Sequence, residues 1–399
     1  MPNPILKSRK ISKAFARISR PFLEFLQLQQ ASGYLLLLAT LIALIWANSP
    51  FGDSFAHFWH TKIDLQIFSF TIEQFVNDGL MTIFFTVVGL EIKRELVQGT
   101  LSTREQAILP VVGAIGGMAF PAIIFLLFNY NTEAATGWAI PTATDIAFSL
   151  AIIQLLGNRV PLSLKVFLMA LAVVDDLGAI IIIASVYSEQ LNLLYFLYSA
   201  MLIVVLFGMN KWNIKNLFLY SSVGALLWYS LNATGIHPTI SGVILALFVP
   251  LKSKNINGLH AEPPLEILLH KLNGFASLLI MPLFALCNSG VSVNVNAVNN
   301  LFSSLSLGIF FALLCGKSFG ITLTVVSTSK MGLTKLPVGI KIYDLFLVNI
   351  LAGIGFTMSI FVTNLAFTNQ QMIDTSKLAI ILASFTAGAL GYTLIRLRK

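Results

Sequence analysis

The sequence predicts an all-α membrane protein with about 12 transmembrane helices. Two observations carry this prediction. Of the 399 residues, 56% are hydrophobic and only 11% are charged, whereas about 25% are charged in a soluble domain. The apolar residues also gather in runs that approach the roughly 20 residues a helix needs to cross a bilayer. A chain of this composition has too little polar surface for water, so lipid is the expected solvent.

The apolar runs follow one another along nearly the whole chain, and the loops between them leave no room for a soluble second domain. We therefore expect a single transmembrane domain over residues 31–399, behind a basic cytoplasmic N-terminal tail over residues 1–30. A cleaved signal peptide is the alternative, but no small-x-small site follows the first run. The run at 238–251 is short, and the count depends most on it. The expected spans are 32–48, 76–98, 107–128, 137–157, 162–187, 191–209, 216–232, 238–251, 267–290, 301–328, 342–367 and 377–396.

Basic residues give the orientation of these spans. With a cytoplasmic N-terminus, the inner loops and tails hold 22 of the 25 Lys and Arg residues, and the outer loops hold only Lys62 and Lys377. Cytoplasmic loops carry such an excess of positive charge. We therefore expect a multi-pass inner-membrane protein with both termini cytoplasmic. The net charge of +8 lies in short clusters, which argues against nucleic-acid binding.

Four ionisable residues fall near the middle of expected spans: Asp145, Asp175, Asp176 and Lys317. Each costs about 2.5–3.5 kcal/mol at the centre of a membrane helix. A structural ion-pair network facing the bundle interior is the alternative to a functional site. Three acids against one base leave excess carboxylate, which a purely structural network would avoid. The pattern therefore favours a site for cations or protons.

The adjacent pair Asp175 and Asp176 predicts competition between protons and a cation. Neighbouring residues on a helix point about 100° apart, so the two carboxylates can line one cavity edge without facing one partner. Burial and mutual repulsion both favour the protonated forms, and the two groups titrate as a coupled unit. Such a pair accepts protons or a hard cation, but not both together. That competition is what an antiporter requires.

The fourth and eleventh expected spans both contain helix-breaking residues. Pro141 lacks a backbone donor, with the Thr142 and Thr144 hydroxyls beside it, while Gly353 and Gly355 weaken the eleventh span. The two spans are seven apart and run in opposite directions, so spans 3–5 and 10–12 predict an inverted repeat with crossing broken helices, as in secondary transporters. Asp145 would then offset two positive helix N-termini, and Lys317 two negative C-termini.

Four runs of the sequence resemble the NhaA family of bacterial sodium/proton antiporters, a family that itself exemplifies inverted repeats. The resemblance covers nearly the whole chain after about residue 20. It implies that Asp175 and Asp176 bind the transported Na⁺ and the protons, that Asp145 and Thr144 belong to the helix crossing, and that Lys317 compensates charge there and pairs with Asp175. Ser318 departs from the family, which usually has Pro. The four runs are 88–95 (VGLEIKRE), 138–148 (WAIPTATDIAF), 167–179 (FLMALAVVDDLGA) and 353–361 (GIGFTMSIF).

The resemblance also implies electrogenic, pH-regulated export of Na⁺, with Li⁺ as a second substrate, by a homodimer that needs no cofactor. A hairpin in the outer loop 49–75 would pair the protomers. The pH sensor would comprise Glu91, Arg94 and Glu95 with Glu266 and His270, although the first three also suit a solvated salt bridge of little energetic value. His237 is linked by the family to the pH response, but an ordinary surface histidine is the simpler interpretation. Asp78 would line the outer mouth or simply begin a helix.

Two further functions are weighed against the antiporter. A sodium-coupled organic anion symporter has a similar crossed-helix fold, but it lacks adjacent aspartates at mid-span. A cation channel would need a carbonyl filter or an acidic ring, which the sequence does not show. Phosphate-loop, zinc and nucleophile motifs are also missing from the sequence, so an enzyme or an ATP-driven pump is not expected. Cys287 and Cys315 are interpreted as packing residues.

Overall fold

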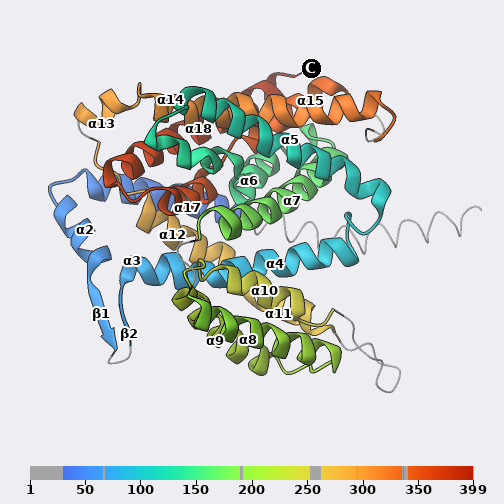
Figure 1. The fold of residues 1–399 in the computed structure, drawn as a ribbon. Helices are drawn as coiled ribbons and strands as arrows, with labels where there is room; N and C mark the ends of the chain where they lie inside the picture. Colours follow the sequence, from blue (N-terminus) through green and yellow to red (C-terminus); the bar gives the residue numbers. More distant parts are fainter. Residues whose placement is uncertain are drawn as a thin grey trace, which may run out of the picture.

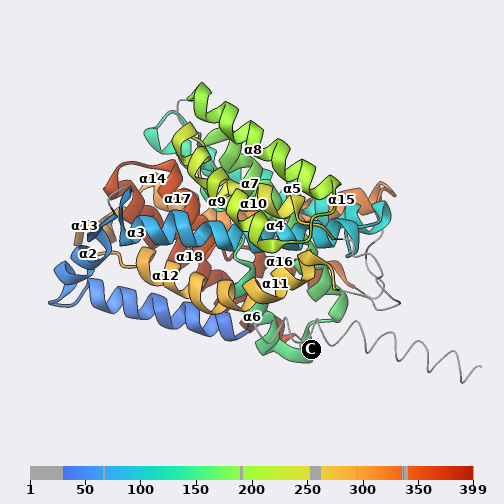
Figure 2. The ribbon, with the colours of Figure 1, turned by 90° about the horizontal axis from the view of Figure 1, so that it is seen from below.

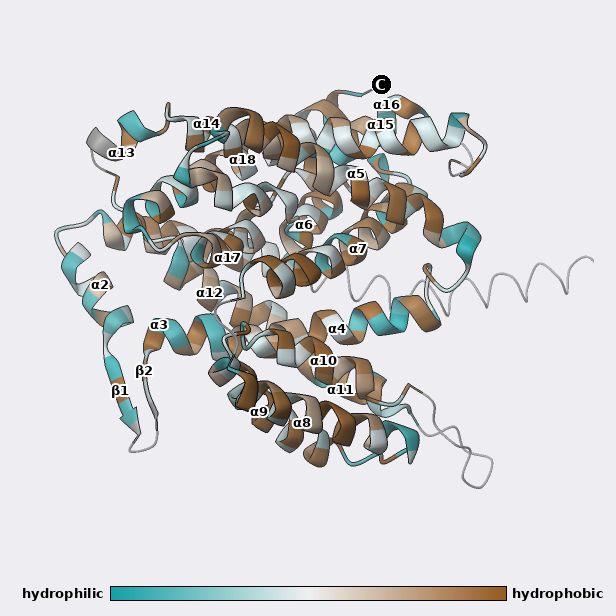
Figure 3. Ribbon diagram, in the orientation of Figure 1, coloured by the Kyte–Doolittle hydropathy of each residue, from teal (hydrophilic) through white to brown (hydrophobic). Residues whose placement is uncertain are grey.

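The computed structural model describes residues 30–65, 68–188, 192–251, 262–293, 295–334, 336 and 340–398. Apart from Gln30, the predicted N-terminal tail lies outside these residues. Nearly all of the described chain is helical, and the helices pack into one bundle (Figure 1). Apolar residues cover the middle of the long helices, while hydrophilic residues gather at the left and right ends of the bundle in Figure 3. This distribution is that of a protein whose two ends face water.

Eight continuous helices in the described residues are long and apolar enough to cross a membrane. Three of them contain a wider π-helical turn. Such turns are rare in proteins, and those that occur are often found at functional sites. The eight are Gln30–Ala47, Ile72–Val97 (α3 Ile72–Gln74, η1 Phe75–Leu80, α4 Met81–Val97), α5 Arg104–Asn129, α7 Leu162–Val186, α8 Leu193–Lys211, Pro264–Asn288 (α11 Pro264–Phe275, η4 Ala276–Ile280, α12 Met281–Asn288), Ser304–Lys330 (α14 Ser304–Phe311, η5 Ala312–Gly316, α15 Lys317–Lys330) and α18 Gln370–Leu397.

Two further spans are broken, as the sequence predicts. The first consists of η2 (Glu133–Thr142), α6 (Ile146–Leu156) and η3 (Gly157–Arg159), with a bend of 41°; the second consists of α16 (Ile342–Ala352) and α17 (Phe356–Ala366), with a bend of 51°. Each broken span lies between two long unbroken helices in chain order. The described residues therefore hold eight spans, or up to ten when each bent pair counts as one. The all-α membrane fold is confirmed, and the count of 12 is not.

The difference between ten and 12 spans corresponds to the two expected spans at 216–232 and 238–251. They correspond to α9 (Leu217–Thr234) and to the nine-residue helix α10 (Ile240–Phe248), neither of which is among the candidate spans. α10 packs tightly along α4, because Gly242 lets the two backbones approach: a Cβ there would lie 2.3 Å from the Thr82 carbonyl oxygen. Figures 1 and 2 both show α8, α9 and α10 together on the α4 side of the bundle.

One charge placed in an outer loop by the sequence belongs to a helix. α18 begins at Gln370, earlier than the expected boundary at 377, and Lys377 is buried within it at 7% exposure. The polar residues of the first turns hid this start, because the expected boundary followed hydropathy alone. One of the two basic residues expected in the outer loops is therefore a buried residue of a helix.

The hairpin expected between residues 49 and 75 forms within the chain. β1 (Lys62–Leu65) and β2 (Phe68–Thr71) pair antiparallel, with Lys62 opposite Thr71, and they project from one end of the bundle beside α2 (Gly52–His60) (Figure 1). We call this end the hairpin side and the other end the Glu91 side. A short helix, α13 (Val295–Asn300), also lies on the hairpin side.

Candidate cation and proton site

The two broken helices touch at their breaks, so residues 202 to 219 positions apart meet at mid-bundle. The Asp145 N–H donates to the Ile354 carbonyl over 2.7 Å, and the Ser149 hydroxyl donates to the Leu351 carbonyl over 2.8 Å. In the other direction, the Ser359 hydroxyl donates to the Ile140 carbonyl over 2.7 Å. Each break frees backbone groups, and the other break satisfies them, which is how irregular backbone is tolerated at membrane depth.

Asp145 lies between the N-termini of two half-helices. It is the N-cap of α6, where its Oδ1 accepts the Phe148 N–H over 3.0 Å. Its Oδ2 accepts the Thr357 N–H over 3.2 Å and the Thr357 hydroxyl over 2.5 Å, in the first turn of α17. The carboxylate is fully buried. Its position is the one that offsets the partial positive charge of two helix N-termini.

Asp175 and Lys317 form a fully buried ion pair. The Lys317 Nζ lies 2.5 Å from Asp175 Oδ2, and neither side chain is exposed. Thr144 completes the group: its hydroxyl lies 2.6 Å from Lys317 Nζ and 2.7 Å from Asp175 Oδ2. The same hydroxyl lies 3.1 Å from the Ala352 carbonyl at the end of α16. The contact between Lys317 and a helix C-terminus therefore runs through Thr144, and the lysine's direct partner is Asp175.

Asp176 differs from its neighbour in having no ion-pair or hydrogen-bond partner among the described residues. It is 7% exposed and faces a cavity of about 40 Å³ that Glu91 and Asp145 also line. About 10–15 Å³ holds one water molecule, so the cavity has room for a small ion with few waters. Asp175 is not part of the lining, which places its ion pair just behind the open carboxylate.

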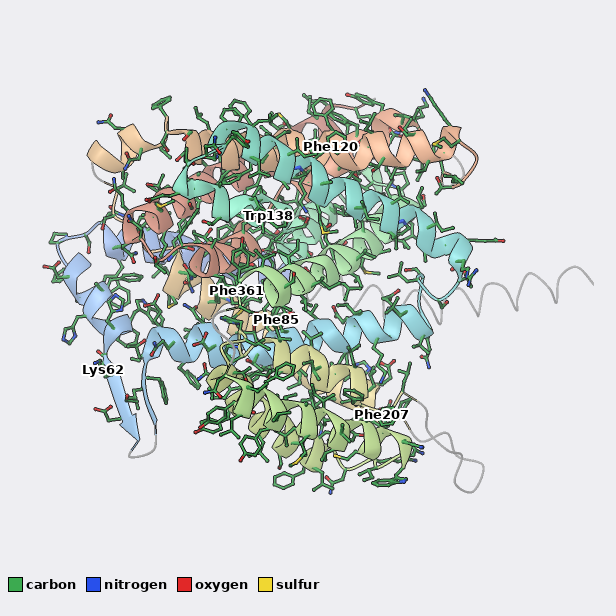
Figure 4. All side chains as sticks on the ribbon, viewed as in Figure 1. Lys62, Phe85, Phe120, Trp138, Phe207 and Phe361 are labelled. Atoms are coloured by element: carbon green, nitrogen blue, oxygen red, sulfur yellow. The ribbon has the colours of Figure 1, made fainter. Side chains whose placement is uncertain are left out.

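A second cavity of about 240 Å³ opens on the hairpin side, lined by Asp78, His237 and Lys377 among others. We call it the outer cavity and the cavity beside Asp176 the inner cavity. Between the two cavities, Phe361 packs on Phe85 with ring centroids 5.3 Å apart, and Figure 4 shows these two rings close together between α4 and α17. The two cavities share no lining residue. The inner cavity therefore extends from Asp176 to Glu91, and aromatic packing separates it from the outer cavity.

His237 is not the surface residue that the simpler interpretation expected. Its side chain is 15% exposed, with Nε2 3.6 Å from Asp78 Oδ1 and Nδ1 2.7 Å from the Thr239 hydroxyl oxygen. Burial lowers the pKa of His237 to about 4, since the charged form loses its hydration. The Asp78 carboxylate is too far for a strong hydrogen bond to offset this effect. Asp78 itself lines the outer cavity.

The residues expected to sense pH are only partly brought together. Glu91 lines the inner cavity, and Glu95 accepts the Thr100 N–H and hydroxyl over 2.8 and 3.0 Å. No salt bridge forms between Glu91 and Arg94 in the described part of the chain, so the solvated salt bridge is not seen. α11, which carries Glu266 and His270, packs against α4. No hydrogen bond or ion pair between described residues joins that pair to the α4 cluster.

Three buried polar features escaped the sequence analysis. Lys377 was hidden by a late helix boundary, and Asn288 is a single amide inside an apolar run, which carries little signal. Asp344, which is 2% exposed, pairs with Arg398 at the end of α18. An aspartate two residues into an expected span was the available signal for that pair. None of the three contacts the paired aspartates.

Crossed broken helices around buried carboxylates, with a cavity reaching the site from one side, define a secondary transporter of the crossed-helix class. Comparison with known proteins agrees with this class. The chain belongs to the family described as Na⁺/H⁺ antiporter 1, whose profile matches residues 23–395. This match confirms the resemblance and shows that the protein is a secondary transporter rather than an enzyme. It gives no support to an organic anion symporter.

Similar proteins share nearly the full length of the chain. The Na(+)/H(+) antiporter NhaA of Vibrio alginolyticus is 44% identical over 375 residues, which cover 93% of this chain and 96% of the relative. The protein of the same name in Vibrio cholerae El Tor Inaba is 43% identical over 377 residues, covering 94% and 97%. That in Oleidesulfovibrio alaskensis is 41% identical, covering 95% and 94%.

Proposed function

We propose that this chain exchanges Na⁺ for protons, and that Asp175 and Asp176 are the groups for which the two ions compete. One observation carries the proposal: of two adjacent buried aspartates, Asp175 is neutralised by Lys317 at 2.5 Å, while Asp176 has no partner among the described residues and faces a cavity of about 40 Å³. The printed names of the relatives support Na⁺ and H⁺ as the exchanged ions.

The geometry supports a displacement mechanism. A Na⁺ ion that enters beside Asp176 is attracted by Asp175 as well, but Lys317 already occupies that carboxylate. Binding therefore requires the site to lose positive charge as the ion arrives: one proton leaves Asp176, and a second leaves Lys317, which frees the Asp175 carboxylate for the ion. The reverse holds when the ion leaves. Na⁺ and protons are thus alternatives at one site because both neutralise the same buried negative charge.

Neutral oxygens would complete the shell of the transported ion. No group of three or more His, Cys, Asp or Glu side chains stands at metal-ligand spacing within the described residues. Hard cations such as Na⁺ prefer oxygen, and Thr144 offers a hydroxyl beside Asp175. Two carboxylates with neutral oxygens suit a weakly held, exchangeable cation, which fits cargo rather than a resident metal.

Several finer features belong to the same proposal. Exchange is electrogenic, with more than one proton entering for each Na⁺ exported, and Li⁺ is a second substrate. The protein resides in the bacterial inner membrane as a homodimer, with both termini in the cytoplasm. Activity is regulated by pH through the Glu91 end of the inner cavity. These features rest on the likeness to the antiporter family and on the charge distribution of the sequence.

Everted vesicles with a pH-sensitive dye test the exchange directly. Addition of Na⁺ should collapse a respiration-driven pH gradient in the wild type, and Asp175→Asn and Asp176→Asn should abolish this at every pH. Asp344→Asn is the matched control, because Asp344 is an equally buried aspartate that lies away from both cavities. Exchange that survives in either site variant, or that is lost equally in the control, would contradict the proposed site.

A further inference from the structure

Three asparagines from separate segments meet at the inner end of the outer cavity. The hub is Asn288, the last residue of α12, which is 1% exposed. Its Oδ1 accepts an N–H of Asn364 from α17 over 2.7 Å, and its Nδ2 donates to Asn77 Oδ1 of η1 over 2.8 Å. The other N–H of Nδ2 donates to the Phe284 carbonyl over 3.0 Å. Every donor and acceptor of the buried amide is used.

The three segments that meet here are also those that line the inner cavity. Phe84, Met281 and Met358 face the inner cavity, and each lies six or seven residues from Asn77, Asn288 or Asn364 along its own segment. At about 1.5 Å per helical residue, the asparagines stand about 9–10.5 Å along their segments from the residues that line the inner cavity. Asn77 and Asn364 line the outer cavity. The cluster thus sits on the outer face of the thin barrier between the two cavities.

Within that barrier, aromatic packing lacks directional bonds. Phe361 lies 5.3 Å from Phe85 and 6.2 Å from Phe284, measured between ring centroids, and such contacts can slide. The amide bonds are directional: Asn364 joins the half-helix α17 to Asn288 of α12, and Asn288 is held in turn by Asn77 of η1. Opening a path from the hairpin side means moving α17 away from α12, so the bond between Asn364 and Asn288 must break first.

We infer that Asn77, Asn288 and Asn364 form an amide clasp that holds the outer gate shut, with Asn288 as its positioning residue. The inference rests on the proposed function, because a gate has meaning only for alternating access. None of the three asparagines bonds to Asp175 or Asp176, and none lines the inner cavity. It sets how often the outer path opens, since weakening bonds made only in the closed state shifts the population toward the open state.

Cys287 is a native reporter for this gate. It precedes Asn288, is 8% exposed, and lies close enough to Glu73 and Lys377 of the outer cavity to interact with their charges. In a Cys315→Ser background it is the single thiol. A membrane-impermeant methanethiosulfonate reagent, added to vesicles that expose the hairpin side, should label it slowly in the wild-type gate.

Asn364→Ala should raise the labelling rate about tenfold, the effect of removing one hydrogen bond worth about 1.4 kcal/mol. This variant is decisive because it acts from α17, across the gate from the thiol; Asn288→Ala should act in the same direction. Asn129→Ala is the matched control, since Asn129 is fully buried and donates to the Phe125 and Ser304 carbonyls away from both cavities. The inference fails if Asn364→Ala labels at the wild-type rate, or if the control rises equally.

Sided kinetics give a second readout. Weakening the clasp should lower the apparent Na⁺ KM on the hairpin side relative to the Glu91 side by about the same factor, whereas a purely structural defect reduces the amount of folded protein and leaves the ratio unchanged. An unchanged ratio would overturn the gate role. Labelling needs no transport, so a wild type without Na⁺/H⁺ exchange would refute the proposed function while the labelling rates would still test the clasp.

Discussion

One position along a helix separates a carboxylate with a lysine partner from a carboxylate that faces a cavity. Asp175 and Asp176 have the same chemistry and nearly the same burial, but the turn of about 100° between them aims one at Lys317 and the other at the inner cavity. The sequence predicted that the two would not face one partner. Which of them would be paired depended on where α15 lies, and no local pattern carries that information.

The buried ion pair predicts a non-additive effect on stability. Lys317→Met leaves Asp175 as an uncompensated charge and should cost about 3–5 kcal/mol, whereas the double variant Lys317→Met with Asp175→Asn should recover most of it, because a neutral pair removes the desolvation problem from both sides. Thermal unfolding of the purified protein in detergent measures this. Equal losses in the single and double variants would show that the lysine stabilises by packing alone.

His237 predicts a pH dependence of stability that is separate from any regulation of activity. Its pKa is about 4 in the folded protein and about 6.5 in an unfolded chain. The unfolded state therefore binds a proton first, and stability falls as the pH drops from about 6.5 to 4, while above 6.5 both states are neutral. His237→Gln should make the melting temperature less dependent on pH between pH 4 and 6.5. It should leave the pH profile of exchange between 6.5 and 8.5 in place, and a shifted profile would restore His237 as a sensor.

At the scale of elements, glycines of α5 and α15 let these two helices approach each other closely. A Cβ on Gly116 would lie 2.5 Å from the Gly320 carbonyl oxygen, and one on Gly320 would lie 2.4 Å from the Gly116 carbonyl oxygen. Small residues at membrane helix interfaces allow such approach. α15 begins at Lys317, and α5 packs on the first half of the first broken span, so the spacing between the two helices sets where the ion pair lies.

Gly116→Ala should therefore destabilise the protein by about 1–3 kcal/mol through overpacking. The control is Gly274→Ala in α11, where a Cβ meets nothing within 4 Å and where alanine should stabilise the helix by about 0.5–1 kcal/mol. Both changes gain the same helix propensity, so the difference in melting temperature isolates the clash. If the two variants melt alike, the helices must be free to separate.

Sequence patterns located the breaks inside spans better than the ends of the continuous helices. Pro141, Gly353 and Gly355 announced both breaks because they remove donors or side chains that a helix needs. The start of α18 was missed because its first turns are polar, and Lys377 moved from loop to core with it. The crossing of the breaks, and with it the double capping by Asp145, follows from contacts between residues about 200 positions apart. Local periodicity cannot specify such contacts.

At the scale of the whole molecule, the number of crossings depends on α9 and α10. Asp78 and Lys93 stand 15 residues apart on the segment that includes α4, or about 22 Å. His237, just before α10, lies 3.6 Å from Asp78, and the Val249 carbonyl, just after α10, accepts the Lys93 Nζ over 2.5 Å. The short helix and its flanks therefore cover the same depth as this part of α4. Ten spans with α9 and α10 added give 12.

A labelling experiment decides between these counts. If α9 crosses, a cysteine at Asn213, between Lys211 and Lys215, should react only from the Glu91 side, and one at Gly235 only from the hairpin side. The turn at 235–239 lies beside the outer cavity, on the hairpin side. If α10 crosses as well, it leads from this turn to the other side, so a cysteine at Glu262 should react only from the Glu91 side. Basic residues favour the cytoplasmic face, so the Asn213 site also fixes which side is cytoplasmic. Labelling of Asn213→Cys and Glu262→Cys from opposite sides would leave α10 as a helix packed on α4 without crossing, and would place the N- and C-termini on opposite sides of the membrane.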